Sequence, residues 1–194
     1  MPNFFSFLSY VVLTTFTPGP NNIMSMSNAS KYGFKKSFNF IFGAFVGFFI
    51  VLALCTAFSS FLLSVLPTVK PILKIIGAAY ILWLAYKTMK SSYDHDKEVK
   101  GVTNTFFSGL MLQFVNPKVI IYGITITSTY ITPYYKSFFI LFIFTLLLAF
   151  IGFISVICWG LFGSIFQKFL KNHTKFVNTL MSILLVYCAV SLFL

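Results

Sequence analysis

Two short stretches of this sequence place helix-breaking residues and polar side chains inside apolar surroundings. One reads TPGPNN from Thr17 to Asn22, and the other reads VNPK from Val115 to Lys118. Proline removes a backbone hydrogen-bond donor and clashes with the carbonyl one turn earlier, so both stretches are predicted to break helices. At membrane depth, unwound backbone is tolerated only where protein buries it or water reaches it. The polar side chains either cap an ordinary kink or bind a polar solute.

Lys118 is the residue in these stretches that is most unfavourable to place in a membrane, because inserting a lysine at mid-helix costs about 2.5 to 3.5 kcal/mol on insertion scales. We expect its ammonium to face a central cavity, where it balances the carboxylate of a small zwitterion or the negative end of a broken helix. The alternative is that the helix begins later and Lys118 lies at the membrane interface. Gln113, Asn116 and Tyr122 lie within about one helical turn and add neutral hydrogen-bonding groups.

The predicted substrate site combines both stretches. It comprises Thr17, Pro18, Gly19, Pro20, Asn21, Asn22, Gln113, Asn116, Pro117, Lys118 and Tyr122.

The composition indicates the environment in which these residues act. Of the 194 residues, 58% are hydrophobic and only 9% are charged, against about 25% charged in an ordinary soluble domain. A soluble protein could not bury so much apolar surface, so the lipid bilayer is the expected solvent. The net charge of +11 comes from 14 lysines scattered between apolar runs, which favours anionic lipid headgroups over nucleic acid as the counter-charge.

Six apolar runs are long enough to cross a bilayer, which needs about 20 residues. We therefore predict an all-α integral membrane protein of one transporter domain, residues 1–194, with a polar linker at 91–105. The six runs are about Phe4 to Met26, Phe38 to Leu66, Ile72 to Met89, Phe106 to Thr127, Ser137 to Phe166, and Phe176 to Leu194.

The lysines predict the orientation of these spans. Ten of them follow the first, third and fifth runs, namely Lys31, Lys35, Lys36, Lys87, Lys90, Lys97, Lys100, Lys168, Lys171 and Lys175, whereas the opposite side has Lys70, Lys74 and Lys136. Because positive loops remain in the cytoplasm, both termini are predicted to lie outside the cell membrane.

The two breaks also indicate an internal repeat. Pro20 and Pro117 are 97 residues apart, half the chain length, and each half holds three predicted spans. Residues 1–90 and 106–194 are thus predicted to form two inverted repeats, with the first and fourth helices broken at proline. Interrupted helices in corresponding positions of two repeats are typical of the substrate site of a secondary transporter.

Enzyme chemistry is not expected. The sequence has no Ser/His/Asp arrangement, phosphate-binding loop or metal-ligand cluster, so no catalytic residue, metal site or cofactor is predicted. All three acids, Asp94, Asp96 and Glu98, lie in the linker. The alternative function is a membrane thiol-redox carrier of similar six-helix plan, which would need two cysteines facing each other near the breaks. The cysteines at 55, 158 and 188 instead lie inside apolar runs, without a CxxC pair and not beside Pro18 or Pro117. A non-transporting membrane scaffold would leave the cost of Lys118 unexplained.

The chain resembles the LysE/RhtB family of amino-acid exporters. The resemblance lies in TPGPNN, in GAAYILWLAYK from Gly77 to Lys87, in LQFVNPKVIIY from Leu112 to Tyr122, in CWGLFGSIFQKF from Cys158 to Phe169, and in LLVYCAV from Leu184 to Val190. It implies export of small amino acids from the cytoplasm, driven by the proton gradient, with Pro18, Gly19, Pro20, Asn21, Asn116, Pro117 and Lys118 at signature positions.

One departure from the family concerns the driving force. Many relatives carry an aspartate in the fifth helix, whereas Ala149 to Trp159 contains no acid here. Proton coupling through such a carboxylate is therefore not expected, and uniport is the alternative. A neutral substrate such as cysteine, O-acetylserine, serine or threonine is favoured over lysine or arginine. The expected partners are this substrate and the lipid bilayer, and a homodimer with a second copy of the chain is a further possibility for its assembly.

Overall fold

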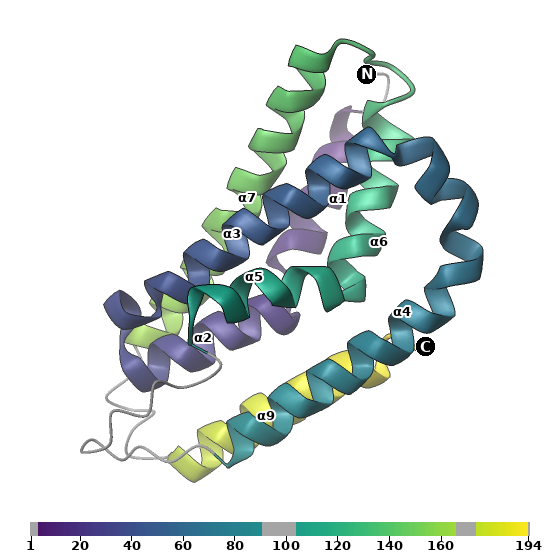
Figure 1. The fold of residues 1–194 in the computed structure, drawn as a ribbon. Helices are drawn as coiled ribbons and strands as arrows, with labels where there is room; N and C mark the ends of the chain where they lie inside the picture. Colours follow the sequence, from purple (N-terminus) through teal and green to yellow (C-terminus); the bar gives the residue numbers. More distant parts are fainter. Residues whose placement is uncertain (1–3, 91–103, 166–173, 194) are drawn as a thin grey trace.

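The computed structural model describes residues 4–90, 104–165 and 174–193, and every element within these ranges is helical. Their arrangement is shown in Figure 1. The elements are α1 (Phe4–Phe16), α2 (Pro20–Tyr32), α3 (Phe34–Ala57), α4 (Ser59–Met89), α5 (Phe106–Val115), α6 (Pro117–Ile126), the π-helical turn η1 (Thr127–Ile131), α7 (Phe138–Ile165) and α9 (Thr174–Val190).

Both predicted helix breaks are confirmed. α1 ends at Phe16, and α2 begins at Pro20 after Gly19, whose backbone is extended. α5 and α6 are separated by Asn116 alone, and the α5 axis is bent by 64° relative to α6 and η1. The residue before a proline avoids the α-helical region, and proline itself is well suited to the first helical position. The two prolines therefore end one helix and begin the next.

The second predicted run, Phe38 to Leu66, does not form one helix. α3 ends at Ala57, Phe58 joins it to α4, and α4 continues through the start of the third predicted run. Pro67 and Pro71 lie inside α4, and each removes a backbone donor and favours bending. Figure 1 shows α4 curving around one side of the molecule. Hydropathy is continuous across Phe58, so it could not reveal this change of direction.

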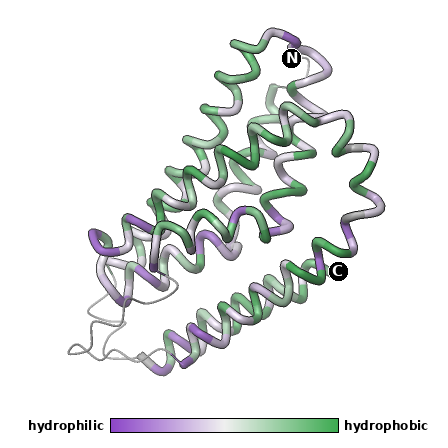
Figure 2. The backbone as a smooth tube through the Cα atoms, in the orientation of Figure 1, coloured by the Kyte–Doolittle hydropathy of each residue, from purple (hydrophilic) through white to green (hydrophobic). Residues whose placement is uncertain are grey.

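Within the described ranges the order of elements is the same in both halves, with a broken helix followed by two further helices. α3, residues 70–89 of α4, and α7 are each long and apolar enough to cross a membrane, and the bent α5–α6 segment is a fourth candidate. Figure 2 shows hydrophobic residues along most of α3 and α7. The chain is thus a multi-pass membrane protein. α1 and α9 are shorter apolar helices, so six spans in two inverted repeats stay a prediction.

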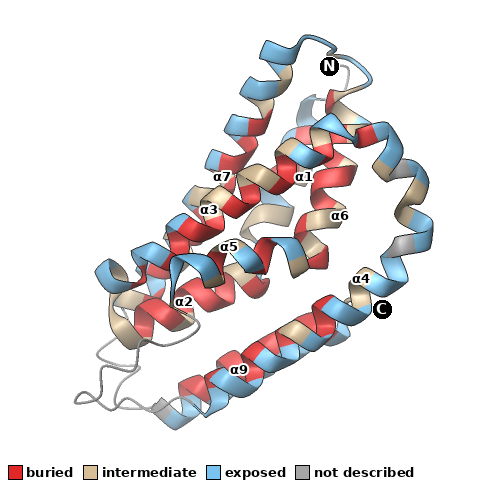
Figure 3. Cartoon of the chain, in the orientation of Figure 1, coloured by how far each residue is buried: buried red, intermediate tan, exposed pale blue. Residues whose placement is uncertain are grey.

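Two apolar clusters form the interior. The first joins α2 and α3 to α4, α5, α7 and α9, and includes Ile23, Ile41 and Leu185. The second joins α1 to α3, α6 and α7, and includes Val11 and Leu52. In Figure 3 the buried residues follow the faces of the helices that meet in the interior. The outward faces are rich in exposed phenylalanine and leucine, as expected of surface that contacts lipid.

Glycines allow α3 and α5 to pack backbone to backbone. A Cβ on Gly43 would collide with the carbonyl oxygen of Phe106, and one on Gly109 would collide with that of Phe40. Gly43 and Gly47 form the GxxxG pattern that the sequence predicts to be a packing motif. This contact fixes α5, and therefore the break that follows it, against α3.

The described lysine-rich segments lie at one end of the molecule. α2 ends, α3 begins, α4 ends and α9 begins there, as Figure 1 shows at its lower left. These ends carry Lys31, Lys35, Lys36, Lys87, Lys90 and Lys175. The asymmetry agrees with the charge pattern on which the predicted orientation rests. The three acids and nearly all of the predicted linker lie outside the described residues.

Candidate functional site

The two helix breaks lie in direct contact. Lys118, in the first turn of α6, extends its ammonium to the break between α1 and α2. Nζ donates to Thr17 Oγ1 at 3.0 Å, to the Thr17 carbonyl at 3.3 Å and to the Pro18 carbonyl at 3.4 Å. The ammonium thereby compensates the negative end of α1, which is one of the two roles the sequence predicts for it.

Side chains from α2 and α7 satisfy the remaining carbonyls at the end of α1. Asn22 donates to the carbonyls of Thr15 at 2.9 Å and Thr17 at 3.0 Å. Ser155 donates to the Thr15 carbonyl at 2.9 Å, and Trp159 Nε1 donates to the Phe16 carbonyl at 3.2 Å. Because an unpaired buried carbonyl is costly, these four side-chain hydrogen bonds stabilise the unwound segment.

A cluster of amide side chains joins α2 to the second break. Asn21 Nδ2 donates to Gln113 Oε1 at 2.8 Å, and Gln113 Nε2 returns a hydrogen bond to Asn21 Oδ1 at 3.1 Å. Asn116 Nδ2 also donates to Asn21 Oδ1, at 3.2 Å, while Asn116 Oδ1 accepts from the Lys118 backbone N–H at 3.1 Å. Gln113 and Asn116 are 0% and 1% exposed. Because both side chains are shielded from solvent, these hydrogen bonds to protein groups hold them in place.

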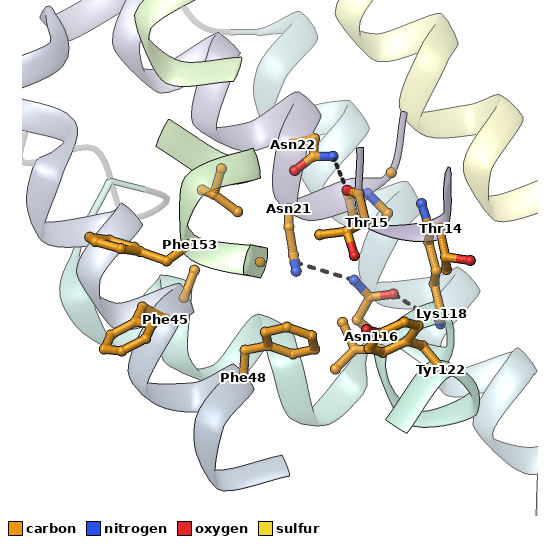
Figure 4. A pocket seen from close by; sticks show the side chains of 16 residues that line it. Thr14, Thr15, Asn21, Asn22, Phe45, Phe48, Asn116, Lys118, Tyr122 and Phe153 are labelled. Atoms are coloured by element: carbon orange, nitrogen blue, oxygen red, sulfur yellow. Dashed lines mark hydrogen bonds between the residues drawn. The ribbon is translucent and has the colours of Figure 1, made fainter. Parts of the chain in front are cut away.

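A pocket that is open to the outside of the molecule lies beside these contacts, and the empty space in and in front of it amounts to about 540 Å³. In Figure 4 the polar residues of α1, α2 and α6 lie on one side and Phe45, Phe48 and Phe153 on the other. Of the described residues that line it, Lys118 alone is charged. The full lining is Thr14, Thr15, Gly19, Pro20, Asn21, Asn22, Ala44, Phe45, Phe48, Asn116, Lys118, Val119, Tyr122, Gly152, Phe153 and Val156.

Tyr122 lines the pocket and is also the first of a column of stacked aromatic rings. Its ring stacks on Tyr10 with centroids 5.7 Å apart, and Tyr10 stacks on Tyr130 at 6.1 Å. The Tyr130 hydroxyl lies 3.1 Å from Ser6 Oγ. The column therefore runs from the pocket along α1 and α6 toward the start of α1.

The structure divides the eleven predicted site residues into two groups. Those that line the pocket are Gly19, Pro20, Asn21, Asn22, Asn116, Lys118 and Tyr122. The other four hold the first group in place. Thr17 and Pro18 accept from Lys118, Gln113 pairs with Asn21, and Pro117 packs closely against Gly77 of α4.

Sequence reasoning missed the apolar wall and the α7 side chains that support the α1 break. Phe45, Phe48 and Phe153 resemble the many lipid-facing phenylalanines in composition, and their inward direction depends on helix packing. Ser155 and Trp159 carried a usable signal, because a serine and a tryptophan N–H inside an apolar run require hydrogen-bond partners.

The cysteines do not form a redox pair among the described residues, where Cys55, Cys158 and Cys188 are all free. Within the described ranges no group of three or more His, Cys, Asp or Glu residues is placed to hold a metal ion.

The fold and the site together define a helical membrane protein whose polar pocket lies at two helix breaks. A family model described as LysE type translocator matches residues 12–194, and the chain belongs to the LysE family. Cysteine/O-acetylserine efflux proteins from Escherichia coli (strain K12) and Salmonella typhi are each 38% identical to it over 188 residues, covering 97% of this chain and 96% of theirs. No solved structure matches. Because the family and these relatives are transporters, the chain is a transporter and not an enzyme.

Proposed function

We propose that the protein is a secondary transporter that exports small neutral amino acids, such as cysteine and O-acetylserine, from the cytoplasm. The relatives named cysteine/O-acetylserine efflux proteins support this substrate class. The observation that carries the proposal is the pocket between the two breaks, in which one ammonium and neutral polar groups face an aromatic wall.

The charge of the pocket favours a substrate with a neutral side chain. Among the described residues that line the pocket, Lys118 is the charged one, and no carboxylate accompanies it. A zwitterion presents its carboxylate to this positive charge at little electrostatic cost. Lysine or arginine would bring a second cation into a low-dielectric site without a counter-ion, which is unfavourable.

Transport by alternating access requires the two broken helices to separate first toward one side and then toward the other. The contacts that must change are those of Lys118 with Thr17 and Pro18, together with the amide cluster around Asn21. In this chain α7 places the hydroxyl of Ser155, rather than an acid, next to the α1 break. We therefore treat uniport and coupling through another group as the two alternatives for the driving force.

The proposal extends to location and assembly. We propose a multi-pass protein of the plasma membrane with both termini outside, acting as one domain, with a homodimer as a further state. The thiol-redox alternative gains no support from the described residues, where no disulfide joins Cys55, Cys158 and Cys188.

Efflux from proteoliposomes tests the function. Vesicles containing the purified protein are loaded with radiolabelled cysteine, O-acetylserine, serine, threonine or lysine, with and without a pH gradient. Faster loss of the neutral amino acids than of lysine supports the proposal, and dependence on the gradient identifies proton coupling. If none leaves faster than from protein-free vesicles under any gradient, the proposal is wrong.

A further inference from the structure

We propose that the N-terminus of α2 and the hydroxyl of Tyr122 form a seat for the α-carboxylate of the substrate. This inference rests on the proposed function and adds which atoms beside Lys118 bind the carboxylate.

At the N-terminus of α2, two backbone N–H groups have no acceptor among the described residues, and they belong to residues that line the pocket. Its N-cap residue is Gly19, and no side chain caps the helix. Pro20 has no N–H, and the Ile23 N–H bonds the Gly19 carbonyl, so the N–H groups of Asn21 and Asn22 remain without an intrahelical acceptor. Such a helix end also carries a partial positive charge, which favours an anion.

The other half-helix at the site differs in this respect. The N-terminus of α6 is capped by Asn116, whose side chain accepts from the Lys118 N–H, and the Val119 N–H bonds the Asn116 carbonyl. The donors of α6 are thus already used. The ligand-binding donors of the pocket are therefore concentrated at α2.

The Tyr122 hydroxyl is the second, independent observation. Tyr122 is 4% exposed and lines the pocket, yet its hydroxyl has no hydrogen bond of normal geometry among the described residues, although the side chain of Thr15 lies nearby. A buried hydroxyl without a partner costs free energy. A ligand that accepts a hydrogen bond in the pocket would remove this cost.

Gly19, which has no side chain, allows the Lys118 ammonium to lie next to the positive N-terminus of α2. A Cβ on Gly19 would lie 3.0 Å from Lys118 Nζ and 3.2 Å from its Cδ, so the ammonium lies against the start of α2. The α1 carbonyls nearby already accept from Asn22, Ser155, Trp159 and Lys118. Among the described residues at this place, the carbonyls at the end of α1 thus already accept hydrogen bonds, whereas two N–H groups of α2 have no intrahelical acceptor, which matches a carboxylate rather than an ammonium.

The rest of the substrate has a complementary surface. The rings of Phe48 and Tyr122 lie 5.9 Å apart, and their faces can attract the substrate ammonium through cation–π contact. The small side chain then packs toward Phe45 and Phe153. This orientation makes the free carboxylate the group that decides binding.

Competition against efflux tests the seat in the full-length protein. Unlabelled cysteine, cysteine methyl ester and cysteamine are compared as inhibitors of radiolabelled cysteine efflux, in the wild type, in Tyr122→Phe and in the control Tyr130→Phe. Tyr130 belongs to the same column but does not line the pocket. Thermal unfolding of each variant reports on folding.

We expect the ester and cysteamine to inhibit the wild type at least tenfold more weakly than cysteine, as loss of hydrogen bonds to a charged group implies. Tyr122→Phe should weaken cysteine about tenfold and leave the ester unchanged, while Tyr130→Phe matches the wild type. Equal inhibition by cysteine and its ester, or an unchanged Tyr122→Phe, overturns the seat while the export function stands. Absence of any efflux by the wild type overturns both.

Discussion

Replacing Lys118 by methionine removes the single positive charge of the pocket lining while keeping a long, unbranched side chain. The variant loses one hydrogen bond of ordinary length, 3.0 Å to Thr17 Oγ1, and two longer ones to the carbonyls of Thr17 and Pro18. A hydrogen bond involving a charged group contributes about 1.5 to 3 kcal/mol. If the same ammonium attracts the substrate carboxylate, the loss corresponds to about a 10- to 150-fold decrease in kcat/KM for efflux.

The assay is initial-rate efflux of radiolabelled cysteine from proteoliposomes with matched protein content. Lys70→Met is the control, because Lys70 is exposed on α4 and does not line the pocket. Lys118→Met should fold, as judged by thermal unfolding, and transport at a small fraction of the wild-type rate, whereas Lys70→Met should retain that rate. Full transport by a folded Lys118→Met protein would refute the reasoning and favour the alternative that Lys118 lies at the membrane interface.

Further substitutions and labels test the packing, the α1 break, the cysteines and the topology. Gly43→Leu should give little folded protein, because a Cβ there collides with the Phe106 carbonyl; fluorescence-detected size exclusion measures this, and a normal monodisperse peak contradicts the close contact. Trp159→Phe should lower stability by about 1 kcal/mol, because the Phe16 carbonyl loses its donor; an unchanged unfolding temperature argues against that role. Replacing all three cysteines by serine should preserve efflux, whereas loss of transport by the folded variant would revive the thiol-redox carrier. Reporters of compartment on each terminus should both signal from outside, and a cytoplasmic C-terminus rejects the six-span topology.

Several elements of the fold follow from sequence because their signals are local. Proline fixes its own backbone and restricts the residue before it, so TPGPNN and NPK locate both breaks. GxxxG likewise predicts a close helix contact, which α3 makes with α5. By contrast, the turn at Phe58 and the continuation of α4 through Pro67 and Pro71 depend on packing against distant helices, and hydropathy does not distinguish them.

In the candidate site too, residues with a local sequence signal could be predicted, whereas those that depend on packing could not. Lys118 could be predicted, because a lone charge in an apolar run must find a partner, and the structure supplies Thr17 and Pro18. Phe48 could not, because one phenylalanine among 27 carries no sign of which way it points. The unused N–H groups of α2 and the unpaired Tyr122 hydroxyl depend on three-dimensional contacts, so sequence could suggest these residues but not which donors remain free.

The most direct test of the account is an experimental structure of the protein in lipid nanodiscs with bound O-acetylserine. The account predicts ligand density between the two breaks, with the carboxylate at the start of α2 near Lys118 and Tyr122, and the side chain against Phe48. Density at another place, with the pocket between the breaks filled by side chains or lipid, would contradict it.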